Sequence, residues 1–126
     1  MGTASKNFWV SEFNCNDGTA VPVQLIPNVL ELAKNLQVLR DELGEPLQIL
    51  SGYRSPAWNK KVGGEPNSYH MKGMASDLTT RGLTPKQLHT KILQLIKAGK
   101  MKEGGLGLYP GFVHYDIRGT AARWVK

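Results

Sequence analysis

The sequence predicts an α+β fold, in which helices pack against a small antiparallel sheet. Three observations lead to this class. A long stretch with helical periodicity precedes a short β-type run, a second amphipathic stretch begins near residue 84, and two short strand-like runs flank a Tyr-Pro-Gly turn. The chain has 126 residues, of which 40% are hydrophobic, so it has room for one core. No repeat or linker divides it, and we expect residues 1–126 to form a single domain.

The two helices are predicted from the spacing of their apolar residues. The first occupies the stretch 26–46, where Pro27 suits the first turn and Gly44 the C-terminal cap. Its apolar stripe, at steps of three and four, consists of Val29, Leu32, Leu36, Leu39 and Leu43. The second helix follows Thr84, whose hydroxyl can cap the N-terminus, and ends at Gly99. Its inward-facing residues are Leu88, Ile92, Leu95 and Ile96.

Four short strands are expected between and after the helices. They lie in "LQILS" (47–51), in "MASDL" (74–78) and on either side of the turn within 104–119. Side chains alternate faces along a strand, so Phe112, His114 and Asp116 should share one face. The segment 52–68 contains so much Gly and Pro that we expect a loop without long regular structure.

Charge and cysteine content limit the possible functions. A formal net charge of +6 favours an anionic partner: nucleic acid, a membrane surface or an acidic cell-wall polymer. The basic residues are dispersed, with the densest cluster at 97–102, and no aromatic residues interleave with them, so we do not expect nucleic-acid binding. No apolar run approaches the roughly 20 residues of a membrane span, and no export signal is visible.

Cys15 is the only cysteine and is expected in the core, so a metal would need His and carboxylate ligands.

Three residues could form such a metal site. If the strand carrying Asp77 lies beside the last hairpin, then His70, Asp77 and His114 could converge. Two neutral imidazoles and one carboxylate form a set that a catalytic zinc accepts, with a fourth position open. The helical H-E-x-x-H arrangement is absent. Pattern alone leaves open that His70 is a hydrogen-bonded loop residue and Asp77 a turn cap.

Three blocks of the sequence resemble a known family. "SGYRSPAWNKKVGG", "NSYHMKGMASDL" and "GGLGLYPGFVHYDIRG", in this order, are similar to the zinc peptidases of the peptidase M15 group. This group includes D-alanyl-D-alanine carboxypeptidases and endolysins and shares its fold with the Hedgehog signalling domain. Its S-x-H-x-x-G-x-A-x-D segment and its later H-x-D are matched by Ser68, His70, Gly73, Ala75, Asp77, His114 and Asp116. The resemblance implies a Hedgehog/DD-peptidase-like fold in which His70, Asp77 and His114 bind zinc.

The resemblance also implies roles for residues around the metal. Arg54 matches the family arginine that holds a carbonyl or carboxylate oxygen of the substrate; alternatively, it braces the loop. Ser68 either contacts the substrate or fixes the turn. Tyr53 is a candidate substrate-binding residue, although Tyr53 and Trp58 could instead be packing residues. His89 lies outside every matched block, and we expect it on the solvated surface.

The general base departs from the family pattern. Many members of the wider group carry Glu or Asp three residues before the last zinc-binding His, whereas this sequence has Gly111. Asp116 is expected on the same face as His114, so it could take the proton from the attacking water. Alternatively, it orients a histidine or pairs with Arg118 or Arg123.

These inferences predict a zinc-dependent peptidase that cleaves peptidoglycan stem peptides or cross-links. We expect it to act as a monomer at the cell wall, either as a phage lysin released from the cytoplasm or as an exported enzyme lacking its signal here. The alternative is a non-catalytic zinc-containing module that binds a cell-wall peptide or a protein partner, and Gly111 keeps this alternative open. No residue indicates which peptide bond is cleaved.

Overall fold

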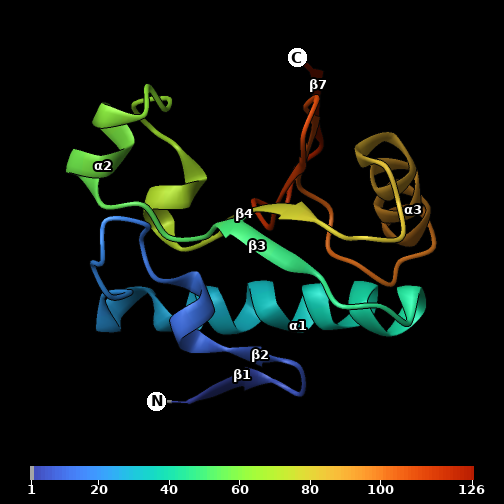
Figure 1. The fold of residues 1–126 in the computed structure, drawn as a ribbon, viewed down its shortest axis with the longest axis horizontal. Helices are drawn as coiled ribbons and strands as arrows, with labels where there is room; N and C mark the ends of the chain where they lie inside the picture. Colours follow the sequence, from blue (N-terminus) through green and yellow to red (C-terminus); the bar gives the residue numbers. More distant parts are fainter. Residues whose placement is uncertain (1) are drawn as a thin grey trace.

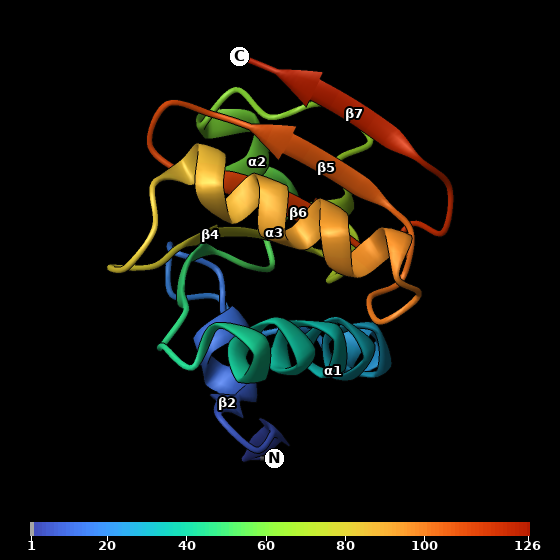
Figure 2. The same ribbon diagram turned by 90° about the vertical axis from the view of Figure 1, so that its right-hand side faces the viewer.

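Helices cover a central sheet in the computed structural model of the protein, which describes residues 2–126 (Figures 1 and 2). The helices are α1 (Ile26–Leu43), α2 (Pro56–Lys61) and α3 (Pro85–Lys97), with short 3-10 segments at Val10–Phe13, Val23–Leu25 and Tyr69–Lys72. The strands are β1 (Thr3–Ser5), β2 (Phe8–Trp9), β3 (Gln48–Ser51), β4 (Ala75–Thr79), β5 (Gly105–Leu108), β6 (Val113–Asp116) and β7 (Ala122–Val125). Figure 2 shows α1 below the sheet and α3 across β5 and β6. The predicted α+β class is confirmed.

The main sheet has five strands in the order β3-β4-β6-β5-β7. The pairs β3–β4, β4–β6 and β5–β6 are antiparallel, as predicted, whereas β5 and β7 are parallel. β7 was not predicted. It reverses direction after β6 but joins the sheet on the far side of β5, so it runs parallel to β5 and makes the sheet mixed.

Both predicted helices form where their apolar stripes indicated. The buried side chains of α1 are Val29, Leu32, Ala33, Leu36 and Leu39, and the helix ends at Gly44, whose φ of 66° suits glycine. At the start of α3, Thr84 Oγ1 accepts from the Gln87 backbone N–H at 3.2 Å, and Gln87 Oε1 accepts from the Thr84 N–H at 2.9 Å. This capping box satisfies two backbone donors at the helix start.

The segment 52–68 contains no long regular element, but it holds one short helix that was not predicted. Ser55 Oγ accepts from the Trp58 backbone N–H at 3.1 Å, and Pro56 occupies the first helical position. The Ser-Pro pair was the available signal for α2.

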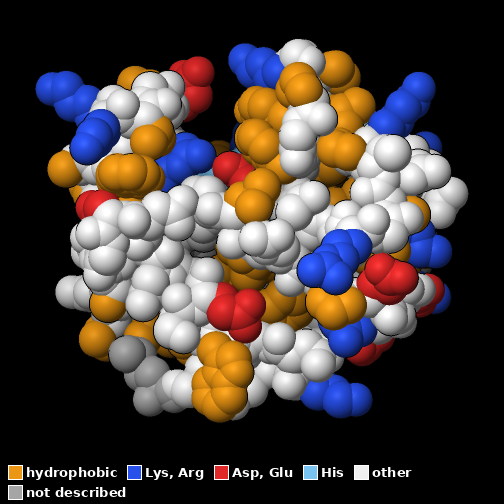
Figure 3. Space-filling model, in the orientation of Figure 1, with side chains coloured by type: hydrophobic (Ala, Val, Ile, Leu, Met, Phe, Trp, Pro, Cys, Tyr) orange, Lys and Arg blue, Asp and Glu red, His pale blue; other side chains and the backbone are white. Residues whose placement is uncertain are grey.

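The core lies between the sheet and the two long helices. Its largest fully buried side chains include Tyr115, Phe13, Leu32 and Leu36, and Cys15 is buried beside them, as expected. None of the helices in residues 2–126 is long and apolar enough to cross a membrane. On the face shown in Figure 3, lysines and arginines are scattered at separate points.

Candidate metal centre

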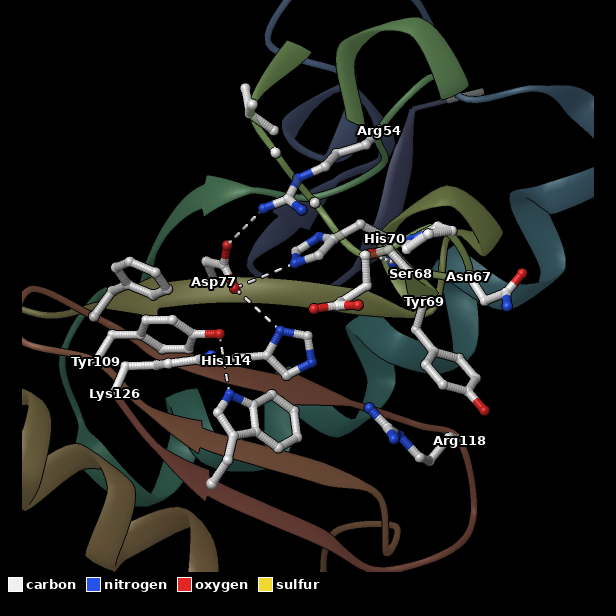
Figure 4. A pocket seen from close by; sticks show the side chains of 17 residues that line it. Arg54, Asn67, Ser68, Tyr69, His70, Asp77, Tyr109, His114, Arg118 and Lys126 are labelled. Atoms are coloured by element: carbon white, nitrogen blue, oxygen red, sulfur yellow. Dashed lines mark hydrogen bonds and ion pairs between the residues drawn. The ribbon is translucent and has the colours of Figure 1, made fainter. Parts of the chain in front are cut away.

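The sheet register places two of the predicted metal ligands side by side. Asp77 on β4 and His114 on β6 are directly paired across the antiparallel ladder. His70 lies in the 3-10 turn before β4, and this turn ends at Gly73, whose φ is 69°. Ligand atoms of His70, Asp77 and His114 all lie within 4.8 Å of one another, and all three residues are buried. The structure therefore brings the three residues together, as Figure 4 shows.

The two imidazoles converge on one carboxylate oxygen. His70 Nε2 lies 3.3 Å from Asp77 Oδ1, and His114 Nδ1 lies 3.2 Å from the same oxygen. The rings meet edge to face, with centroids 5.2 Å apart.

The outer nitrogen of each ring has a partner that fixes its proton. His70 Nδ1 lies 2.7 Å from the Gly52 carbonyl oxygen, which can only accept a hydrogen bond. His114 Nε2 lies 2.7 Å from Asp116 Oδ2, a buried carboxylate oxygen. A neutral ring in each position therefore carries its hydrogen on the outer nitrogen and directs its lone pair inward.

This arrangement fits a zinc ion. With both rings neutral, two nitrogen lone pairs and an ionised carboxylate oxygen face one another, and a cation between them would relieve their repulsion. Two imidazole nitrogens and one carboxylate oxygen are three of the four ligands of a catalytic zinc, whose remaining position stays open. The outer-nitrogen contacts are those that zinc-binding histidines usually make.

The protonation of the cluster follows from its contacts. In the metal-free protein burial raises the pKa of Asp77, but its contacts with the imidazoles of His114 and His70 outweigh burial and hold that pKa below its ordinary value. Asp77 is therefore ionised and able to bind a metal. Burial lowers the pKa of His114, but its bonds to Asp116 and Asp77 raise it overall in the absence of a metal.

Arg54 lies against the cluster. Its Nη2 is 3.3 Å from Asp77 Oδ2, Nε is 3.3 Å from Ser51 Oγ, and Nη1 is 3.4 Å from Asn59 Oδ1. The guanidinium is half-buried and lines a cavity of about 660 Å³ that also contains His70, Asp77 and His114. Arg54 thus braces Asp77 and also faces the space in which a ligand of the metal would sit.

One wall of this cavity is aromatic and was not predicted from the sequence. Tyr109 and Phe112 stack with centroids 4.4 Å apart, and Trp124 Nε1 donates to Tyr109 Oη at 3.0 Å. The Trp124 ring lies 5.0 Å from that of His114. Trp124 reaches this wall from β7, so missing the strand also meant missing this residue. In Figure 3 the cavity appears as the hollow between the α2 region and β7.

Asp116 lies behind His114 and not in the cavity. Its side chain is fully buried, and Oδ2 contacts His114 Nε2 and Arg118 Nη2, each at 2.7 Å. Oδ1 accepts from Arg118 Nε and from the Gly105 N–H, both at 2.9 Å. Burial raises the pKa of Asp116, but the bonds from His114 and Arg118 hold it below its ordinary value. These are the contacts that the orienting role requires, and Arg118 is the arginine that pairs with Asp116.

The remaining candidates differ in position. Ser68 lines the cavity, and its Oγ accepts from the His70 backbone N–H at 3.2 Å, so it fixes the turn that carries His70. Tyr53 is not brought to the cluster: its ring packs in the core and does not line the cavity. Its neighbours Gly52 and Arg54 face the cluster, while the Tyr53 N–H bonds to Phe13 on the other side.

Two residues that were assigned no function lie outside this cavity. Trp58 is partly buried against the core, as a packing residue would be. His89 was expected on the solvated surface, but it is half-buried on α3. Burial and the charge of Arg123 lower the pKa of His89.

The sequence of the chain is similar to those of known proteins. The family model described as Peptidase M15 matches residues 6–116. Over 105 residues the chain is 29% identical to the probable peptidoglycan L,D-endopeptidase MepK of Haemophilus influenzae, an alignment that covers 78% of this chain and 53% of that protein. Over 78 residues it is 37% identical to the zinc D-Ala-D-Ala carboxypeptidase of Streptomyces albus G, covering 57% of this chain and 31% of that protein. The chain thus spans about half or less of the length of these relatives. Because the family match extends over most of the sequence, the chain belongs to the peptidase M15 family.

Proposed function

We propose that the protein is a zinc-dependent peptidase that cleaves peptidoglycan stem peptides or their cross-links. One observation carries the proposal: two imidazole nitrogens, each oriented by a partner on its outer side, meet one carboxylate oxygen in a cavity. Membership of the peptidase M15 family and the names of the two relatives support the reaction and the substrate class.

The metal would be held by His70 Nε2, by Asp77 and by His114 Nδ1. When bound, zinc acts as a Lewis acid on a carbonyl group and makes water a nucleophile near neutral pH. The chain supplies the orientation of the ligands. The Gly52 carbonyl holds the ring of His70, and Asp116 holds the ring of His114 in the tautomer that leaves Nδ1 free.

Arg54 would bind the carbonyl oxygen of the scissile peptide. Its guanidinium is fixed by Ser51, Asn59 and Asp77, so it needs little reorganisation when negative charge develops on that oxygen. The aromatic wall formed by Tyr109, Phe112 and Trp124 would contact the side chains of the peptide. The net charge of +6 suits an anionic wall polymer.

All residues of this centre come from one chain, and we expect the active form to be a monomeric single domain. Sedimentation of the active protein measures its oligomeric state directly.

The proposal is tested by elemental analysis and by digestion. The purified protein is expected to hold one zinc per chain and to release new amino termini from purified peptidoglycan. Two defined substrates, a stem pentapeptide ending in D-Ala-D-Ala and an L,D-cross-linked dimer, identify the bond by mass spectrometry. The His114→Ala variant serves as the control without an intact metal site. Stoichiometric zinc without cleavage of any of these substrates would contradict the peptidase function and favour the alternative, a zinc-containing binding module, which Gly111 leaves open.

A further inference from the structure

The proposed reaction needs a group that accepts a proton from the attacking water, and few carboxylates can serve. Position 111 carries glycine. Asp116 is fully buried behind His114. Both carboxylate oxygens of Asp77 already have partners: Oδ1 lies against the ring nitrogens of His70 and His114, and Oδ2 accepts a hydrogen bond from Arg54. Among the described residues that line the cavity, Glu65 supplies the one other carboxylate side chain.

The backbone of Glu65 is anchored beside the cluster. Its carbonyl oxygen accepts from Asn59 Nδ2 at 2.9 Å and from the Ser68 N–H at 3.0 Å. Asn59 is buried, and its own side-chain oxygen accepts from Arg54 Nη1. The adjacent Gly64 is also tightly packed, because a Cβ built there would lie 3.0 Å from Arg54 Nη1. The loop therefore carries Glu65 next to the guanidinium that contacts Asp77.

The carboxylate of Glu65 is free to react. Glu65 is exposed, and within residues 2–126 no hydrogen bond or ion pair engages its carboxylate. A flexible Glu side chain extends several ångströms from a fixed backbone, and a proton acceptor must reach the attacking water directly or through one further water. Glu65 lines the cavity with a free carboxylate, whereas the carboxylate of Asp116 is buried behind His114 and bonded to it and to Arg118.

We propose that Glu65 is the catalytic proton acceptor of this chain, an assignment that rests on the proposed peptidase function. The water oxygen bonds to the carbonyl carbon while one water proton passes to a Glu65 carboxylate oxygen, and the π electron pair of the carbonyl moves to its oxygen beside Arg54. Glu65 then gives the proton to the amide nitrogen as the C–N bond breaks and the C=O bond re-forms. The products are a carboxylic acid and an amine, and no further reactant is needed.

The test compares variants of the zinc-loaded protein on the defined substrate that the wild type cleaves fastest. Glu65→Gln keeps the shape but cannot accept the proton, so kcat should fall by about 10²–10⁴-fold, with KM, zinc content and melting temperature unchanged. In Glu65→Ala, added formate should restore part of the rate because a small carboxylate can enter the vacated space. Glu45→Gln removes the same charge outside this cavity and should keep the wild-type rate.

Two results would overturn the assignment while the wild type remains active. One is a Glu65→Gln variant in which both kcat and KM are unchanged. The other is a raised KM with unchanged kcat, which would mean that Glu65 binds a cationic group of the substrate. A zinc-loaded wild type that cleaves nothing would overturn the proposed function, and the role of Glu65 with it, so the two failures are distinguishable.

Discussion

Replacing Asp116 by asparagine should change the tautomer of His114. Oδ1 of Asp116 receives hydrogen bonds from the Gly105 N–H and from Arg118, so the amide oxygen of asparagine must take this place. The amide NH₂ then replaces Oδ2 and faces His114 Nε2. Since this NH₂ only donates, Nε2 must accept, and the ring hydrogen moves to Nδ1, the atom that faces Asp77 and the metal position.

The expected losses follow from these contacts. Disturbing a partner that orients a metal-binding histidine typically costs about 10–100-fold in metal affinity. The variant also loses charge-assisted bonds and places its NH₂ against Arg118 Nη2, which should cost about 2–3 kcal/mol in the metal-free protein. An unfolding entropy of about 2.1 cal/mol/K per residue gives about 0.26 kcal/mol/K for this chain. The melting temperature should therefore fall by about 8–12 °C.

Three measurements check this prediction. Zinc affinity is measured by competition with a chelator, metal-free stability by thermal unfolding, and the tautomer of His114 by ¹⁵N NMR. Asp41→Asn, on the exposed face of α1, is the matched control and should change none of them. Zinc affinity within twofold of the wild type, or a hydrogen still on Nε2 in the variant, would refute the argument that Asp116 sets the tautomer.

Three further predictions concern the metal, the substrate oxygen and the aromatic wall. His70→Ala and His114→Ala should each lose stoichiometric zinc, because two protein ligands rarely retain a catalytic zinc. Full zinc content in both variants, measured by elemental analysis, would refute the assignment of these residues as ligands. Arg54→Ala should keep its zinc but lose on the order of 10²–10³ in kcat, and an unchanged rate would leave Arg54 with only its bracing role. Gly107→Ala should destabilise the protein by about 1–3 kcal/mol in denaturant unfolding, because its Cβ would collide with the Trp124 indole. An unchanged midpoint would show that Trp124 moves aside freely.

Local signals explain which parts of the fold could be predicted. The signals that predict α1 and α3, namely the spacing of apolar residues and the capping residues, all lie within the helical segments or directly beside them. Both helices form at the expected positions. β7 has only four residues, and it exists through pairing with β5, whose residues lie about 17 positions earlier. No local pattern carries that pairing, so the strand, and Trp124 with it, could not be read from the sequence.

In the candidate site, too, some features could be predicted from the sequence and others could not. The pattern around His70, Asp77 and His114 left their convergence as one possibility, and the resemblance to the peptidase M15 group implied it. In the structure a strand pair and a turn bring the three residues together. Sequence alone did not decide the direction in which Tyr53 and Asp116 face. Tyr53 turns toward the core beside Phe13, and Asp116 is drawn behind His114 by Arg118 and Gly105, contacts that exist only in the folded chain.

The parts of the site also differ in how firmly the fold holds them. Asp77 and His114 are paired across β4 and β6, and a slip of one residue in this register would send one of them to the opposite face of the sheet. The backbone bonds that hold the sheet together therefore also fix these two ligands, while His70 is held by the 3-10 turn before β4. Glu65 lies instead on a loop rich in Gly and Pro, anchored through Asn59 and Ser68. Because the Glu65 carboxylate bonds to none of the metal ligands within residues 2–126, replacing the Glu65 side chain should alter turnover while zinc affinity stays at its wild-type value.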